Sequence, residues 1–497
     1  MKRITICDRT PIPPFDEPAR DLRILNKPLW LMQHDLLKRY CKSTHEVKSL
    51  ADVEKLPLSS DEELFVYKDN LYFNAELLDE FVAKARATKH ACQIAFEAED
   101  VDSSKKGDAS IVAHAIHLQS GIQRRGNAYV ADMYYFPAGQ REEPQPLVID
   151  TQAGEMGYYN IPGYMGDKSN NLTYQIPIRA FLSIENWVHI LLANVPMGVF
   201  SWGRVQDELM NKARLRDFRH WVKEDWSALW AKLRLSLTAF GERINPFEER
   251  WRNHFLACKQ LVKVGKNCSI DPTAIIHGPT VIGDNVYIGP GTVIANSLIG
   301  NNVNIMQGSQ IMLSVVSDRC FLPFNAGLFM TTLMENTMVA QNSTLQLCVV
   351  GRNTFIGANN CFTDFNLRGE PIRTLHNGKL EQVRLPVLGS AVGHSCKMGS
   401  GFIVYPGRMI GSNSVIIFDH DDTLIRKNVP VTSHEVDELT GEPRRTVYYW
   451  PRVYDPAQHD TPSASDESES NGAVAPDAFR LASVKSPTNH ASVTLGG

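Results

Sequence analysis

The sequence has little of what marks a secreted or membrane-spanning protein. Its nine cysteines form no CxxC pair, so we expect free thiols in a reducing compartment and no disulfide framework or cysteine zinc site. Residues 1–10 carry four charged side chains around a short apolar stretch, unlike a signal peptide. No stretch approaches the ~18 uncharged apolar residues of a membrane span. We therefore expect a cytoplasmic protein without a membrane span.

An excess of charge of one sign is also lacking. The 51 Lys and Arg residues are balanced by 55 Asp and Glu residues, which gives a net charge of -4. Because nucleic-acid binding needs a basic excess or a basic stripe, we expect no nucleic-acid partner. The apolar share of 43% and the charged share of 21% are typical of a globular protein. A length of 497 residues predicts two or three domains.

A six-residue repeat is the strongest pattern in the chain. From Val264 to Ile311 every sixth residue is aliphatic, with one single-residue deletion, and further tracts cover 333–362 and 392–416. This period predicts a left-handed parallel β-helix, in which six residues form one flat side and three sides form a turn of roughly 18 residues. Gly and Asn at the corners would supply the positive φ angles of the tight turns.

The rest of the chain divides by composition. Short β-like runs alternate with helical patterns over 1–204, which predicts an α/β domain. Residues 205–262 have long helical periodicity and predict a helical connector to the β-helix at 263–425. An aromatic segment at 426–459 is expected to dock on the folded body. The Ser- and acid-rich residues 460–497 are expected to form a disordered tail. The predicted fold class is thus α/β plus all-β.

A polar segment interrupts the repeat at 367–386 and contains His376 and Glu381. Such an excursion either covers a ligand groove between neighbouring subunits or is a surface insertion. Isolated coils of this kind expose flat apolar faces. We therefore expect a homotrimer.

An α/β domain, a helical linker and a hexapeptide-repeat coil, in that order, resemble the bifunctional sugar-1-phosphate nucleotidylyltransferase and amino-sugar N-acetyltransferase family. The coil carries the more specific similarity, at 339–368 for the acetyltransferase core and at 388–411 for the closing turns. In the first domain, residues 26–29 are similar to the family's K-P-L turn. Residues 184–187 and 193–194 resemble the segment that closes its sugar site.

For the first domain, the resemblance implies nucleotidylyl transfer to a sugar 1-phosphate with Mg²⁺. Lys27 would clamp the phosphates, and Asp69 falls at the family's metal-binding aspartate. Arg20, Arg23 and Asn194 would contact the substrate. A nucleotide sugar or a sugar 1-phosphate would then be the small-molecule partner, and the first domain would be nucleotidyltransferase-like.

For the coil, the resemblance implies acyl transfer from an acyl-CoA, with Gln341, Asn366 and Arg368 among the substrate-binding residues. The transfer needs a general base, normally a histidine. Because Gln341 stands where the family has that histidine, His394 or His376 would have to replace it, and His394 is the candidate catalytic residue.

The first domain also departs from the family pattern. The family holds phosphates with a Gly-rich loop after the first strand, but residues 8–18 contain four prolines and no glycine. The alternative to an active transferase is therefore a catalytically silent trimeric scaffold that binds a nucleotide sugar.

Overall fold

The computed structural model describes most of the chain. The described residues are 1–41, 43–56, 62–98, 108, 110–111, 118, 121–139, 142–160, 171–205, 261–366, 370–418, 424–429 and 446–450. The predicted helical connector lies outside them between 206 and 260, as does the whole predicted tail. Within the described ranges, no helix is long and apolar enough to cross a membrane.

A mixed seven-stranded sheet forms the centre of the first part of the chain. Its strands are β1 (Lys2–Ile6), β6 (Ser43–Val47), β7 (Leu64–Lys68), β9 (Cys92–Glu97), β10 (Ile122–Arg125), β11 (Ala128–Phe136) and β12 (Gln145–Val148). They lie in the order β12-β9-β11-β7-β1-β6, with β10 paired to β11. Strands β6, β1 and β7 are parallel, and β11 is antiparallel to β7 and β9. With its helices this is the α/β arrangement expected, while its assignment as nucleotidyltransferase-like stays a prediction.

Helices and short strand pairs surround this sheet. Helix α2 (Ala75–Thr88) begins at Asn74, whose side-chain oxygen accepts a hydrogen bond from the Leu77 N–H. It ends at Lys89, which adopts a left-handed φ of 59°. The other helical elements are α1 (Leu29–Leu37), α4 (Trp187–Asn194), η1 (Ala19–Asp21), η2 (Leu50–Lys55) and η3 (Val195–Phe200). The strand pairs are β2 (Pro11–Ile12) with β3 (Glu17–Pro18), β4 (Arg23–Ile24) with β5 (Lys27–Pro28), β8 (Leu71–Phe73) with β15 (Phe181–Ser183), and β13 (Gly154–Asn160) with β14 (Asn171–Ile176).

From Val262 onward the chain winds through three parallel sheets, which we call the first, second and third faces. The first face contains β16 (Val262–Val264), β19 (Thr280–Ile282), β22 (Leu298–Ile299), β25 (Val315–Val316), β28 (Thr332–Leu333), β31 (Val349–Val350), β36 (Ala391–Val392) and β39 (Met409–Ile410). The second contains β17 (Ser269–Ile270), β20 (Tyr287–Ile288), β23 (Asn304–Ile305), β26 (Phe321–Leu322), β29 (Met338–Val339), β32 (Phe355–Ile356), β37 (Lys397–Met398), β40 (Ser414–Phe418) and β42 (Thr446–Trp450). The third contains β18 (Ile275–His277), β21 (Val293–Ala295), β24 (Gln310–Met312), β27 (Gly327–Phe329), β30 (Thr344–Gln346), β33 (Cys361–Phe362), β38 (Ile403–Val404) and β41 (Leu424–Ile425).

Three parallel sheets visited in rotation fit a left-handed β-helix of hexapeptide repeats, which confirms that part of the predicted fold class. The aliphatic column lines its interior. Ile282 pairs with Ile299, and Ile299 with Val316, so these turns contain 17 residues, whereas the pairing of Val264 with Ile282 gives a first turn of 18. The structure adds a turn that the six-residue count from Ile311 does not predict, with the buried residues Val316, Leu322 and Leu328.

Positive φ angles recur at the corners of the coil, as predicted. Asparagines on successive turns of one corner stack, and Asn336 Nδ2 donates to Asn353 Oδ1 at 2.8 Å. Residues with bulkier side chains, including Arg319 and Leu347, also adopt positive φ there. The hydrogen bonds of neighbouring turns thus hold a conformation that costs most residues roughly 1–2 kcal/mol.

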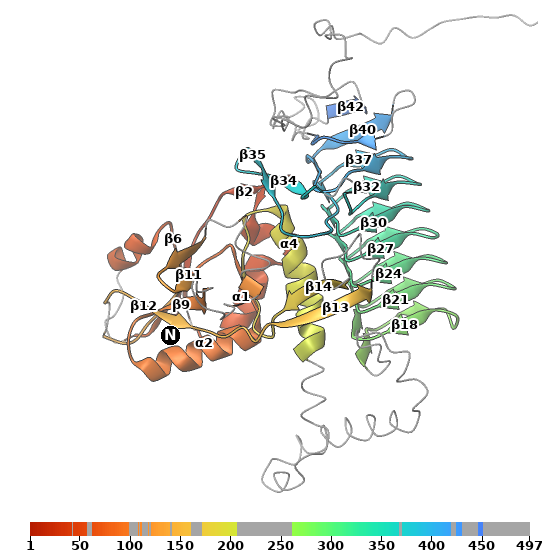
Figure 1. Ribbon diagram of the computed structural model, residues 1–497. Helices are drawn as coiled ribbons and strands as arrows, with labels where there is room; N and C mark the ends of the chain where they lie inside the picture. The colour runs from red at the N-terminus through yellow and green to blue at the C-terminus, as the bar shows by residue number, and fades with distance from the viewer. Residues whose placement is uncertain are drawn as a thin grey trace, which may run out of the picture.

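The α/β domain packs on the first face of the β-helix, with α4 between the mixed sheet and the coil (Figure 1). Trp187 and Leu191 of α4 belong to the same buried apolar cluster as Val315 and Val349, which point outward from the first face. The two parts therefore share one apolar cluster at their interface, and the interior of the coil forms a second cluster.

Replacing Thr332 by valine is expected to stabilise this interface. Thr332 lies on β28, is fully buried, and its hydroxyl oxygen has no hydrogen-bond partner among the described residues. Removing an unpaired buried hydroxyl should raise the free energy of unfolding by about 1 kcal/mol in urea denaturation. The neighbouring Thr331 is the control, because its hydroxyl contacts the carbonyl oxygens of Phe329 and Leu345, both at 3.0 Å. Thr331→Val should lower stability, and a change of the same sign in both variants would contradict the prediction.

Candidate functional site

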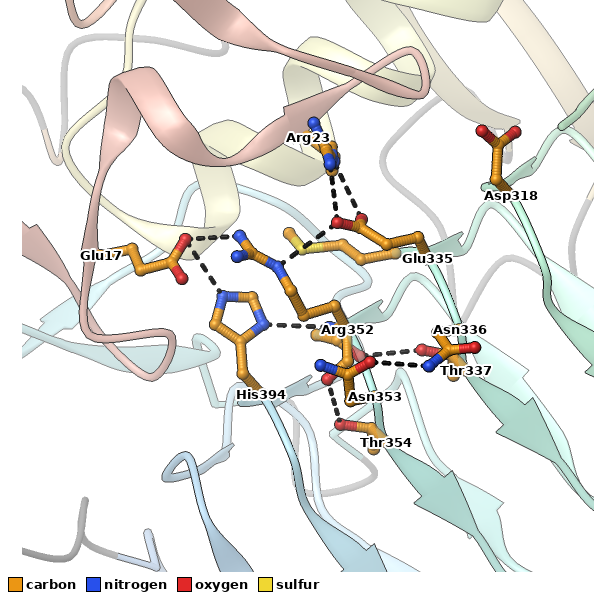
Figure 2. Close-up of polar contacts among 12 residues, drawn as sticks. Glu17, Arg23, Asp318, Glu335, Asn336, Thr337, Arg352, Asn353, Thr354 and His394 are labelled. Carbon is orange, nitrogen blue, oxygen red and sulfur yellow. Dashed lines mark hydrogen bonds and ion pairs between the residues drawn. The ribbon is translucent and has the colours of Figure 1, made fainter. Parts of the chain in front are cut away.

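A row of polar side chains follows the corner at which each turn of the coil leaves the first face. Each member stands two positions after an inward-pointing residue, so strand register stacks the row on successive turns. Residues 14–26 of the α/β domain run along this row and contact it (Figure 2). We call these contacts the interdomain clamp. On the coil its members are Asp318, Glu335, Arg352, His394 and Ser412.

Glu17, Arg352 and His394 form the centre of the clamp. Glu17 Oε2 lies 2.5 Å from Arg352 Nη2 and 3.6 Å from His394 Nε2. His394 Nδ1 accepts the backbone N–H of Arg352 at 2.9 Å, and the residue is only 7% exposed. Since Nδ1 acts as the acceptor, the proton of the neutral ring is on Nε2 and faces Glu17. The lone pair of this ring is held by a backbone N–H at 2.9 Å, which does not favour the predicted role of His394 as a catalytic base.

Arg23 extends the clamp by one turn. Its Nε and Nη2 donate to the two carboxylate oxygens of Glu335 at 2.9 and 2.7 Å, a bidentate pairing that fixes orientation as well as charge. Arg352 Nε lies 3.5 Å from the same carboxylate. Glu335 is therefore held between two guanidinium groups, one from each part of the molecule.

At the two ends of the clamp, the groups that the α/β domain contributes carry no charge. The two-residue turn between β4 and β5 has positive φ at Leu25 and Asn26, and Asn26 Nδ2 donates to Asp318 Oδ1 at 2.8 Å. At the other end, the backbone N–H and the hydroxyl of Ser412 donate to the Pro14 carbonyl at 3.1 and 2.8 Å. The proline-rich segment that follows β1 thus docks on the coil.

The charged groups of the clamp have shifted pKa values. Burial raises the pKa of Glu17, but its contacts with His394 and Arg352 outweigh this and hold it below the ordinary value. Burial also raises the pKa of Glu335, but its hydrogen bonds with Arg23 outweigh this and lower the pKa below the ordinary value. For His394, burial lowers the pKa against the attraction of Glu17. All three groups therefore bind protons more weakly in the folded protein than in the unfolded chain.

Acidification is accordingly expected to weaken the fold. The contribution of His394 is complete above its unfolded pKa near 6.5 and is lost as the pH falls through the lower folded value. The contributions of Glu17 and Glu335 are complete above about 4.5 and are lost at still lower pH. Urea denaturation at several pH values should show a stability that declines below pH 6.5. A stability that rises on acidification through this range would contradict the assignment.

Arg20 and the buried Asp69 form a charge network at the carboxyl ends of β1 and β7. Arg20 Nη1 donates to Asp69 Oδ2 at 3.0 Å, and its Nη2 lies 3.2 Å from Glu46. The other Asp69 oxygen accepts the Asp8 N–H at 2.8 Å. Both oxygens are thus engaged, and the part of the chain that the structure describes contains no group of three His, Cys, Asp or Glu side chains that could hold a metal ion. These residues do not fit a Mg²⁺ site.

The remaining predicted residues of the first domain also have protein partners. Lys27 is exposed and pairs with Asp35 at 2.8 Å. Asn194 is fully buried, with its Oδ1 accepting the Leu25 N–H at 2.7 Å and its Nδ2 donating to the Arg23 carbonyl at 3.2 Å. Asn194 thus holds the β4–β5 hairpin to α4, and Arg23 holds it to Glu335 of the coil. This arrangement gives no support to nucleotidylyl transfer.

The predicted substrate residues of the coil that the structure describes, Gln341 and Asn366, lie on different turns. Gln341 lies exposed in the turn between β29 and β30, and Asn366 Nδ2 donates to the Glu370 carbonyl at 3.2 Å. Arg368 lies outside the described residues. Their roles in substrate binding stay predictions.

The polar excursion forms a hairpin of β34 (Arg373–His376) and β35 (Lys379–Gln382), joined by Asn377 and Gly378 in positive φ. The sequence Asn-Gly favours such a two-residue turn. His376 Nδ1 lies 3.2 Å from Glu381 Oε2. Because an ionised carboxylate only accepts, Nδ1 carries a proton, and the neutral ring has its lone pair at Nε2, which lies 3.4 Å from Asn377 Nδ2. A carboxylate orients general-base histidines in this way.

No sequence motif assigns a role to Glu17, Glu335 or Arg352, and Glu381 stands out in the sequence only as part of a polar segment. A signal for the coil residues exists. Aligning the turns in their own register places Asp318, Glu335 and Arg352 at one position of successive turns. A charged row at a fixed corner position indicates a polar contact surface.

Comparison with known proteins identifies the repeats. The family model described as Bacterial transferase hexapeptide (six repeats) matches residues 262–296, the beginning of the β-helix. A search of curated protein sequences finds no match to the chain.

Several solved structures are similar to part of the chain. The polysialic acid O-acetyltransferase OatWY is 19% identical, over 41% of this chain and 98% of that chain, with a TM-score of 0.17. A mutant of GDP-perosamine N-acetyl transferase from Caulobacter crescentus, in complex with CoA and GDP-perosamine, is 16% identical over 34% of this chain and 51% of that chain, with a TM-score of 0.13. A putative acetyltransferase from Bacillus cereus is 14% identical over 31% of this chain and 77% of that chain, with a TM-score of 0.14.

Proposed function

We propose that the protein is an acyltransferase that moves an acyl group from an acyl-CoA to a hydroxyl or amino group. His376 is the general base, and Glu381 orients it. The observation that carries this proposal is the His376–Glu381 pair on a hairpin that leaves the β-helix. The match of residues 262–296 to a hexapeptide transferase model supports it.

The proposed reaction is a direct transfer. The acceptor oxygen or nitrogen attacks the thioester carbonyl, and a C–O or C–N bond forms as the C–S bond breaks. The acceptor proton passes to His376 Nε2 and from there to the departing thiolate, so that free CoA and an ester or amide are the products. Glu381 stabilises the ring while it holds the proton.

The proposed acceptor is a sugar or a nucleotide sugar, as the resemblance of the coil implies. The nucleotidylyl-transfer half of the expected function is not part of the proposal, because Arg20, Arg23 and Asn194 bind other protein groups. The alternative is the catalytically silent scaffold, which would bind a nucleotide sugar but form no product.

We also propose the homotrimer. Outward-facing aromatic residues follow the second face, and Tyr287, Phe321 and Phe355 are each between 37 and 39% exposed. They alternate with Asn304 and Met338 on the intervening turns, and exposed rings in such a row are typical of an interface between copies. Light scattering should give the mass of three chains, and the mass of one chain would overturn this part.

The test incubates the full chain with acetyl-CoA and a panel of amino sugars, neutral sugars and their nucleotide conjugates. Free thiol is measured with a chromogenic disulfide, and mass spectrometry identifies the acylated product. Thiol release that depends on one acceptor is expected. A rise in melting temperature with CoA or a nucleotide sugar, but without product from any acceptor, would overturn the acyltransferase and favour the silent scaffold.

A further inference from the structure

The hairpin that carries His376 has little support of its own. Among the described strands, β34 pairs only with β35, and neither joins a face of the coil. A two-stranded hairpin by itself is marginally stable in water. Its position therefore depends on the groups against which it packs.

The α/β domain supplies those groups from the start of α4. Trp187 Nε1 donates to Thr374 Oγ1 at 2.8 Å, and Asn186 Nδ2 donates to the Leu375 carbonyl at 3.0 Å. Asn186, Trp187 and Thr374 are each no more than 1% exposed. The two bonds thus fix the two residues that immediately precede His376.

A buried histidine sets the shape of the segment that makes these contacts. His189 Nδ1 accepts the backbone N–H groups of Glu185 and Asn186 at 3.0 and 3.2 Å, which caps the start of α4. Burial lowers the pKa of His189 to about 4. The ring is therefore neutral at physiological pH and remains an acceptor for both groups.

Other contacts hold the base of the hairpin. Ile372 and Val383, which flank the two strands, belong to the apolar cluster shared by the α/β domain and the coil. A side chain on Gly407 of the coil would collide with the Arg373 carbonyl, so the coil backbone touches the first residue of β34. Loss of the two polar bonds would then shift the end of the hairpin without detaching its base.

We infer that Trp187 and Asn186 are positioning residues, through which the α/β domain places His376 for acyl transfer on the coil. This inference rests on the proposed function. It makes the α/β domain a structural part of the acyl-transfer site, since the residues next to the base are held from that domain.

The experiment compares Trp187→Phe, Thr374→Val and the double variant in the full chain. Each single variant removes one partner of the same buried hydrogen bond, and the double variant removes both. We expect kcat for acyl transfer to fall about 10- to 100-fold, as for a small misplacement of a catalytic group, with an unchanged KM for acyl-CoA. The double variant should lose no more than the worse single variant, because both delete one interaction. Trp30→Phe, at a tryptophan that is 42% exposed, is the matched control and should keep the wild-type kcat.

Two outcomes separate this inference from the proposed function. If His376→Asn abolishes transfer while Trp187→Phe and Thr374→Val keep kcat within about twofold, the positioning role is overturned and the proposed function stands. If His376→Asn keeps the wild-type rate, the proposed function fails. Amide hydrogen exchange tests the contact independently of activity. Exchange of residues 373–382 should be faster in Thr374→Val than in wild type, and equal protection would overturn the inference.

Discussion

Replacing His376 by asparagine is expected to lower kcat for acyl transfer by about 10²- to 10⁴-fold, the usual contribution of a general base. Asparagine keeps a polar group near Glu381 but cannot accept the proton of the attacking hydroxyl or amine. The measurement is acceptor-dependent thiol release at saturating acyl-CoA. The KM for acyl-CoA should change little, because the base acts on the acceptor.

His394→Asn is the matched histidine control. His394 lies in the interdomain clamp with its Nδ1 bound to the Arg352 N–H, so its loss should lower stability and leave kcat per folded molecule unchanged. Glu381→Gln should cause a smaller loss than His376→Asn, because glutamine can still accept from Nδ1 but does not stabilise the charged ring. A larger loss of kcat in His394→Asn than in His376→Asn would reverse the assignment of the base.

Glu335→Ala should lower the free energy of unfolding by about 2–4 kcal/mol. It removes the shared partner of Arg23 and Arg352, and breaking a mostly buried ion pair from one side leaves charge without compensation. The side chain of Glu335 is 11% exposed, and that of Arg23 is 26% exposed, so water does not readily replace the contact. Urea denaturation measures the loss.

The matched control for this prediction is Asp35→Ala. Asp35 pairs with Lys27 and Lys38, but all three side chains are at least one-third exposed. Such exposed pairs contribute about 0–1 kcal/mol. If both alanine variants lost the same stability, Glu335 would not link the two parts of the molecule.

The sequence predicts the coil well because its rule is local. A buried aliphatic residue must recur every six positions, and this period can be found directly in the amino-acid sequence. The six-residue count does not predict the turn at 315–329, for a physical reason. Turns of 17 residues shift the six-residue phase once per turn, so counting forward in fixed steps from Ile311 misses Val316.

The clamp could not be predicted in this way, because its partners are far apart in the chain. Arg23 and Glu335 are separated by 312 positions, and no periodicity links them. The local sequence also does not distinguish an arginine that binds phosphate from an arginine that binds a buried carboxylate. The prolines of 8–18 were a usable signal, since a segment without glycine is poorly suited to wrap around phosphates. Asn194 shows the same limit, because its amide binds backbone groups where a substrate was expected.

The order of the clamp contacts restricts how the coil can change its length. Residues 14, 17, 23 and 26 contact the coil at 412, at 394 and 352, at 335 and at 318, respectively. Insertion of one whole turn between Asp318 and Ser412 would lengthen that span by one strand spacing, about 4.8 Å, and would separate at least one pair. A turn added before Asp318 would leave every pair in place. Natural length variation in relatives that keep the clamp should therefore be confined to the turns before Asp318 and after Ser412.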